Sequence, residues 1–124
     1  MDAGIVKLRC HEVWTRDDGI TVLSILPDAA VMLEDAEEVC QEVVKINQGE
    51  PRPLLVDMRQ IGSITSEAKA RYTKEQASIS AMALLVNHPI EKMLGNYWVV
   101  HQLETLTKLF ISEKEAVEWL RKYL

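Results

Sequence analysis

The stretch Pro53-Leu54-Leu55-Val56-Asp57-Met58-Arg59 decides the fold class of this chain. Its apolar residues are continuous and do not alternate with polar ones, so a strand buried on both faces is expected. A polar stretch and a helix-forming segment follow. A strand that leads into a helix is typical of a parallel α/β sheet, where loop N–H groups at the strand's carboxyl end can face a ligand. The stretch therefore predicts a fold class and a functional edge, but no reaction.

The other elements follow from periodicity and turn signals. Two β-rich segments, 5–14 and 20–26, flank a turn with Asp18-Gly19, which predicts an antiparallel hairpin. This order of elements predicts an α/β fold with a sheet of about five strands, parallel beyond the hairpin, and four helices. Further strands are expected at 54–58, 81–86 and 108–111. The helices are expected at 34–47, 66–78, from Pro89 onward and at 112–123. A capping box from Ser112 to Glu115 opens the last helix.

Length and composition narrow the function classes. A chain of 124 residues predicts a single domain over 1–124. Its formal net charge of −5 offers no basic surface for nucleic acid or anionic lipid. Cys10 and Cys40 sit in apolar patterns outside any Cys-x-x-Cys motif, so reduced core thiols of a cytoplasmic protein are expected. No signal peptide is expected, and no apolar segment approaches the roughly 18 residues of a membrane span.

Two strings carry a resemblance to a known family. One is Leu54-Leu55-Val56-Asp57-Met58 with its polar loop and helix. The other is Leu109-Phe110-Ile111-Ser112-Glu113-Lys114-Glu115-Ala116-Val117-Glu118-Trp119-Leu120. With the order of elements, they resemble the STAS superfamily, the SpoIIAA-like domains related to anti-sigma-factor antagonists. The resemblance covers residues 4–124 and implies a non-catalytic regulatory or binding module of a bacterial cytoplasm.

The resemblance also bears on phosphorylation. Members that act in sigma-factor control carry Asp-Ser-Ser-Gly at the start of the helix after this strand, and the second serine accepts the phosphate. Aligning the strand-end aspartate with Asp57 places that motif on Thr65-Ser66-Glu67-Ala68. The first serine is retained as Ser66, but Glu67 stands at the acceptor position. The resemblance therefore implies a domain without the phosphoacceptor serine.

Candidate binding residues follow the ends of the two central strands. Asp57 is expected to accept loop N–H groups or to act as a functional carboxylate. Arg59 would pair with an anion or simply be solvated. Ser66 is expected chiefly to cap its helix, with a ligand or regulatory role as the alternative. If the sheet is parallel, the residues after the strand at 81–86 neighbour the Asp57 loop. The predicted site comprises Asp57, Arg59, Ser63, Thr65, Ser66, Glu67, Asn87 and His88.

The leading hypothesis is a binding module that meets a protein partner or a small ligand at this edge. The alternative is a small-molecule or lipid carrier, since the SpoIIAA-like fold resembles lipid-binding Sec14-like domains. The sequence shows no nucleophile–base pair, no Gly-rich phosphate loop and no metal-ligand spacing, so no enzyme, metal or cofactor is expected. A second apolar face on the helix from Pro89 predicts a homodimer or partner contact through Trp98, Val99 and Leu103.

Overall fold

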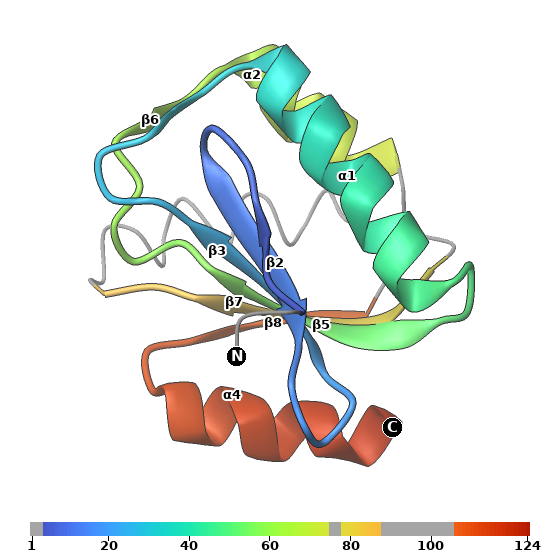
Figure 1. Cartoon of the computed structure of the whole chain (residues 1–124). Helices are drawn as coiled ribbons and strands as arrows, with labels where there is room; N and C mark the ends of the chain where they lie inside the picture. Colours follow the sequence, from blue (N-terminus) through green and yellow to red (C-terminus); the bar gives the residue numbers. More distant parts are fainter. Residues whose placement is uncertain (1–3, 75–77, 88–105) are drawn as a thin grey trace.

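The computed structural model describes residues 4–74, 78–87 and 106–124. Across these ranges the main sheet has six strands in the order β1-β2-β3-β5-β7-β8 (Figure 1). The first three strands pair in antiparallel fashion, and β3, β5, β7 and β8 run parallel. The strands are β1 (Val6–Lys7), β2 (His11–Thr15), β3 (Thr21–Ile25), β5 (Arg52–Asp57), β7 (Ile79–Leu85) and β8 (Leu106–Phe110).

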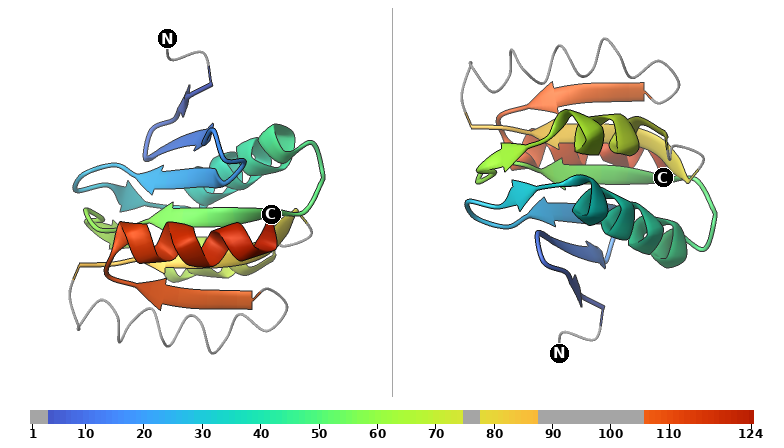
Figure 2. Two further views of the ribbon diagram at one scale, coloured as in Figure 1. Left: turned by 90° about the horizontal axis from the view of Figure 1, so that it is seen from below. Right: turned by 90° about the horizontal axis from the view of Figure 1, so that it is seen from above.

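Helices cover both faces of this sheet. Figures 1 and 2 show α1 (Leu33–Asn47) and α2 (Ser66–Lys74) on one face and α4 (Glu113–Leu120) on the other. A short 3-10 turn, Arg121–Tyr123, follows α4. The mixed α/β class and the mostly parallel sheet are as the sequence predicted. The described residues hold three α-helices, and the predicted helix from Pro89 lies outside them.

The prediction of about five strands is wrong, because the segment 5–14 is not one strand. The chain reverses after Lys7, where the Leu8 N–H donates to the His11 carbonyl at 2.8 Å. Val6 consequently pairs with Val13 in an antiparallel ladder. In the reversal, Arg9 leaves the sheet and its Nε donates to Asp35 of α1 at 2.9 Å. This contact lies 26 residues away in the chain, so the local alternation of residues did not indicate it.

A second, two-stranded sheet was not predicted. Strands β4 (Ala30–Val31) and β6 (Ser63–Ile64) pair in parallel and join the loops that follow β3 and β5. We name this pair the clasp. Gly62 lies at its start, and its N–H donates to the Ala29 carbonyl at 3.1 Å. A Cβ atom at Gly62 would lie 2.6 Å from the Asp28 carbonyl oxygen, so only glycine fits this approach without a shift of the backbone.

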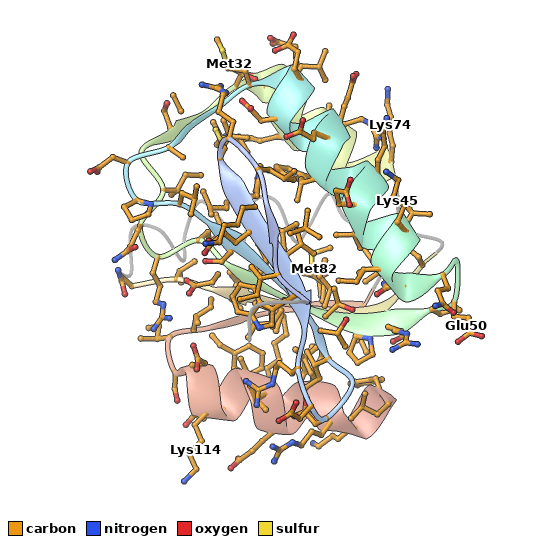
Figure 3. All side chains as sticks on the ribbon, viewed as in Figure 1. Met32, Lys45, Glu50, Lys74, Met82 and Lys114 are labelled. Carbon is orange, nitrogen blue, oxygen red and sulfur yellow. The ribbon has the colours of Figure 1, made fainter. Side chains whose placement is uncertain are left out.

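The central strands are buried on both faces, as the continuous apolar run predicted. Leu54 and Val56 pack in the core beneath α1 and α2, whereas Leu55 packs in the core against α4. Met82 of β7 lies between the sheet and the α1–α2 layer, while Lys45, Lys74 and Lys114 project outward in Figure 3. Because both faces are covered, the polar side chains of these strands gather at their ends.

Candidate functional site

The carboxyl ends of β5, β7 and β8 meet at one edge of the sheet, because these strands are parallel neighbours. Asp57 ends β5, Asn87 follows β7, and Glu113 opens α4 directly after β8. The loop after β5 adds Arg59 and Gln60. Four of these residues, Asp57, Arg59, Gln60 and Asn87, line a polar hollow of about 330 Å³. We refer to it as the hollow.

Arg59 lies at the centre of this edge. Its Nε donates to Asp57 Oδ1 at 2.9 Å and its Nη2 to Asp57 Oδ2 at 2.8 Å, in a bidentate pair. The same Nη2 also donates to Glu113 Oε1 at 3.2 Å. Of the two alternatives for Arg59, the structure shows pairing with anionic groups, the carboxylates of Asp57 and Glu113, rather than solvation alone. The pair was within reach of sequence reasoning, but the Glu113 contact spans 54 residues and depends on the packing of α4.

Asp57 keeps its charge in this arrangement. Burial raises the pKa of Asp57, but hydrogen bonds from the Arg59 side chain and backbone lower it more, so the net pKa lies below the usual value. The Arg59 N–H donates to Asp57 Oδ1 at 3.2 Å, which confirms the predicted role of Asp57 as an acceptor for the loop. The pKa of Arg59 is raised, chiefly by its hydrogen bond to Asp57. Both groups are therefore ionised at neutral pH.

Asn87 joins the next strand to this loop, as the sequence predicted. Its Nδ2 donates to the Arg59 carbonyl at 2.9 Å, and the Met58 N–H donates to the Leu85 carbonyl at 3.1 Å. His88, the other residue expected here, lies outside the described residues.

The cap of α2 differs from the expectation by one residue. The Thr65 hydroxyl accepts the Ala68 N–H at 3.1 Å, which makes Thr65 the N-cap. Ser66 is the first helical residue and is exposed, so the prediction that Ser66 caps the helix is wrong. Two adjacent hydroxyl residues offer the same capping chemistry, and the backbone path through the clasp decides between them.

The remaining predicted site residues lie along β6 and the start of α2. Ser63 belongs to the clasp and is exposed, and Glu67 is an exposed carboxylate in the first turn of α2. Figure 1 shows this part of the chain leading from the sheet edge up to the α1–α2 layer. Ser63, Thr65, Ser66 and Glu67 are absent from the lining of the hollow. The predicted site thus separates into the hollow and the entry to α2.

Sequence reasoning missed Gln60 and Glu113. A signal for Glu113 existed, because the capping box places it at a helix start. The Ser112 hydroxyl does accept the Glu115 N–H, at 3.3 Å. In a parallel sheet this helix starts at the same edge as the end of β5, so the two observations together indicate the position of Glu113. Gln60 carries no comparable signal.

Two further predictions concern a dimer contact and a ligand cavity. Trp98, Val99 and Leu103 lie outside the described residues, so the predicted homodimer contact stays a prediction. For the carrier alternative, an apolar cavity beneath α1 and α2 measures about 30 Å³. Ligand pockets usually enclose about 300–1,000 Å³, so this cavity is too small for a lipid chain.

Each helix within the described ranges falls short of the length and apolarity that crossing a membrane requires.

The family follows from one comparison. A model described as "Domain of unknown function (DUF7793)" matches residues 13–124. The chain belongs to this family. No curated protein sequence matches the DUF7793 chain significantly.

Solved structures similar to the DUF7793 chain show its fold. An uncharacterised DUF3478-family protein with a SpoIIAA-like fold from Shewanella loihica PV-4 has a TM-score of 0.67 and 15% identity, covering 94% of this chain and 90% of that one. An anti-sigma factor antagonist from Mycobacterium paratuberculosis has a TM-score of 0.62 and 14% identity, covering 98% and 97%. The predicted SpoIIAA-like, or STAS-type, fold is therefore confirmed.

Proposed function

We propose that this DUF7793 domain is a non-catalytic regulatory module that binds a protein partner at the carboxyl edge of its parallel strands. The observation that carries the proposal is the Arg59 guanidinium, held between Asp57 and Glu113 beside the hollow. Together with Asn87, these contacts join three separate segments into one ordered polar surface. Side chains ordered before binding lose less conformational entropy when a partner docks. The fold shared with an anti-sigma factor antagonist supports a protein as the partner.

The electrostatics of the hollow support a role without catalysis. A general acid or base works best with a pKa near the operating pH, and carboxylates in that role have a raised pKa. The pKa of Asp57 is lowered instead, because its hydrogen bonds with Arg59 outweigh the effect of burial. Asp57 is thus suited to hold Arg59 in place and to accept hydrogen bonds.

We further propose that serine phosphorylation does not switch this module, because aligning the motif from Asp57 places Glu67 at the acceptor position. A carboxylate carries one negative charge and lacks the third acceptor oxygen of a phosphate, whose charge is about −1.5 to −2. Glu67 therefore replaces a switch with a fixed charge in the first turn of α2. Incubation with anti-sigma kinases and mapping by mass spectrometry should find no stoichiometric phosphate. Such a phosphate on Ser63, Thr65 or Ser66 would restore the switch.

A site-specific crosslink tests the binding surface. A photo-reactive amino acid replaces Gln60, which is exposed and lines the hollow, or Gln41, which is an exposed residue of α1. After irradiation in cells, the variant at position 60 should form a discrete adduct with one partner protein, and the variant at position 41 should not. Adducts at position 41 alone, or the same adducts at both positions, would place the binding surface elsewhere.

A further inference from the structure

A buried histidine connects the N-terminal hairpin to α2. His11, the first residue of β2, has none of its side chain exposed. Its Nε2 lies 2.6 Å from the Tyr72 hydroxyl of α2, in a buried hydrogen bond between residues 61 positions apart. The two rings meet edge to face, with centroids 6.1 Å apart. This contact is distant from the hollow in the chain and plays no part in the proposed binding.

The other ring nitrogen of His11, Nδ1, is buried and has no hydrogen-bond partner among the described residues. A neutral imidazole tolerates this arrangement at a cost, whichever nitrogen carries the proton. A protonated imidazole must donate from both nitrogens and carry a charge out of contact with water. The closed arrangement around His11 therefore strongly disfavours its protonation.

The titratable groups around the pair do not compensate that charge. Tyr72 faces His11 from α2, Asp35 and Cys40 approach from α1, and Cys10 precedes His11 in its own hairpin. Asp35 is the one carboxylate among these groups, and it already binds the Arg9 guanidinium and the Met32 N–H. Burial consequently dominates and lowers the pKa of His11 to about 4, against a smaller opposing effect of Asp35.

Among the described helices, α2 is the one best able to move. Among its side chains whose burial is described, only those of Ala68 and Tyr72 are buried. Tyr72 and Ile79 also line the small apolar cavity beneath the helices, so the packing under Tyr72 is incomplete. The second core, which packs α4 against the sheet, includes no residue of α2. Elements with few buried contacts open at lower free energy than the core.

We propose that His11 and Tyr72 form an acid-sensitive latch, which holds α2 against the sheet and releases it when His11 is protonated. After release, α4 stays packed on the sheet, because the core that they share includes no residue of α2. The core on the other face of the sheet loses Ala68 and Tyr72 but keeps the buried residues of α1. Release alters the surface that carries Ser66 and Glu67. Failure of the partner-binding proposal would leave the latch untouched, since the latch concerns α2 in the free domain.

Hydrogen exchange followed by mass spectrometry at pH 7 and pH 5 tests the latch, with labelling times corrected for the intrinsic rate at each pH. The pKa of His11 is about 4 in the latched state, and after release it should return to the ordinary histidine value of 6.5. Between pH 7 and pH 5 the equilibrium constant for the opening of α2 should therefore rise about 20-fold. Peptides from α2 should lose protection by about this factor, while peptides from β5 and α4 keep theirs. Unchanged protection of α2, or equal loss in all three, would overturn the proposal.

Two variants assign the effect. In His11→Phe the pH dependence of α2 exchange should disappear, and its persistence would mean that another group is the trigger. Tyr72→Phe removes the hydroxyl and keeps the ring, which makes it informative even if His11→Phe fails to fold. It should expose α2 to exchange already at pH 7, with β5 and α4 unchanged. Full protection of α2 at pH 7 in Tyr72→Phe would equally contradict the latch.

Discussion

Alanine substitutions at two asparagines, one buried and one exposed, distinguish polar groups that stabilise the fold from polar groups of the proposed binding site. Asn47, the last residue of α1, is fully buried. Its Oδ1 accepts the Thr21 hydroxyl at 2.6 Å and its Nδ2 donates to the Ser78 carbonyl at 2.9 Å. Asn87 is exposed and donates to the Arg59 carbonyl at 2.9 Å. Replacing each with alanine makes the same chemical deletion at two levels of burial.

The expected costs differ severalfold. Asn47→Ala leaves the Thr21 hydroxyl buried without its Asn47 partner, which costs about 1–3 kcal/mol. It also removes one of two hydrogen bonds to the Ser78 carbonyl, which keeps the Arg52 N–H at 3.0 Å, and this loss costs about 0.5–1.5 kcal/mol. The free energy of unfolding should therefore fall by about 1.5–4.5 kcal/mol, against a total of about 5–15 kcal/mol for a typical domain. Asn87→Ala should cost less than about 1 kcal/mol, because water replaces the amide at an exposed position.

Equilibrium urea denaturation measures both costs. A lower midpoint with an unchanged slope reports a change in stability alone. Similar midpoints for the two variants, or a larger loss in Asn87→Ala, would refute the reasoning. Such a result would mean that Asn87 maintains the fold, and its place in a binding surface would lose its support.

The same comparison of matched substitutions applies elsewhere. Leu120 of α4 is fully buried, so Leu120→Ala should lower the free energy of unfolding by about 2–5 kcal/mol in urea denaturation. Leu106 is half exposed, so Leu106→Ala should lower it by less than about 1 kcal/mol. Equal costs for the two variants would mean that α4 is not docked. Thr65→Ala should cost about 1 kcal/mol and Ser66→Ala close to none, and the reverse order would restore Ser66 as the cap. The hydrogen bond from Arg9 lowers the pKa of Asp35 to about 2. The free energy of unfolding that Asp35 contributes should therefore be lost as the pH falls from about 4 to 2. Asp35→Asn should reduce this acid sensitivity.

The sequence predicted the features that depend on neighbouring residues, and it did not predict those that depend on contacts between residues far apart in the chain. The continuous run 54–56 predicted a strand buried on both faces, because local apolarity reports burial directly. The break between β1 and β2 coincides with the contact of Arg9 with Asp35, which no local pattern encodes. The clasp likewise depends on backbone hydrogen bonds between two loops about 30 residues apart, such as that from Gly62 to Ala29. Short strands of this kind have no periodicity of their own.

The site shows the same division. Asp57 and Asn87 were predicted because parallel topology brings strand ends together, and the structure joins both to Arg59. Glu113 required combining that topology with the capping signal of a helix far along the chain. The serine and threonine residues of β6 and α2 were grouped with Asp57 because they follow it in the sequence. The clasp carries them away from the hollow toward the helical layer.

The most direct measurement is a calorimetric titration of the partner identified by the crosslink at position 60. Gln60→Trp should obstruct the hollow that Gln60 lines, and Gln41→Trp places the same side chain on the exposed face of α1. With circular dichroism confirming that both variants are folded, Gln60→Trp should weaken the affinity at least about tenfold, equivalent to about 1.4 kcal/mol. Gln41→Trp should bind as the unmodified domain does. Equal affinities of the two variants would contradict binding at the hollow.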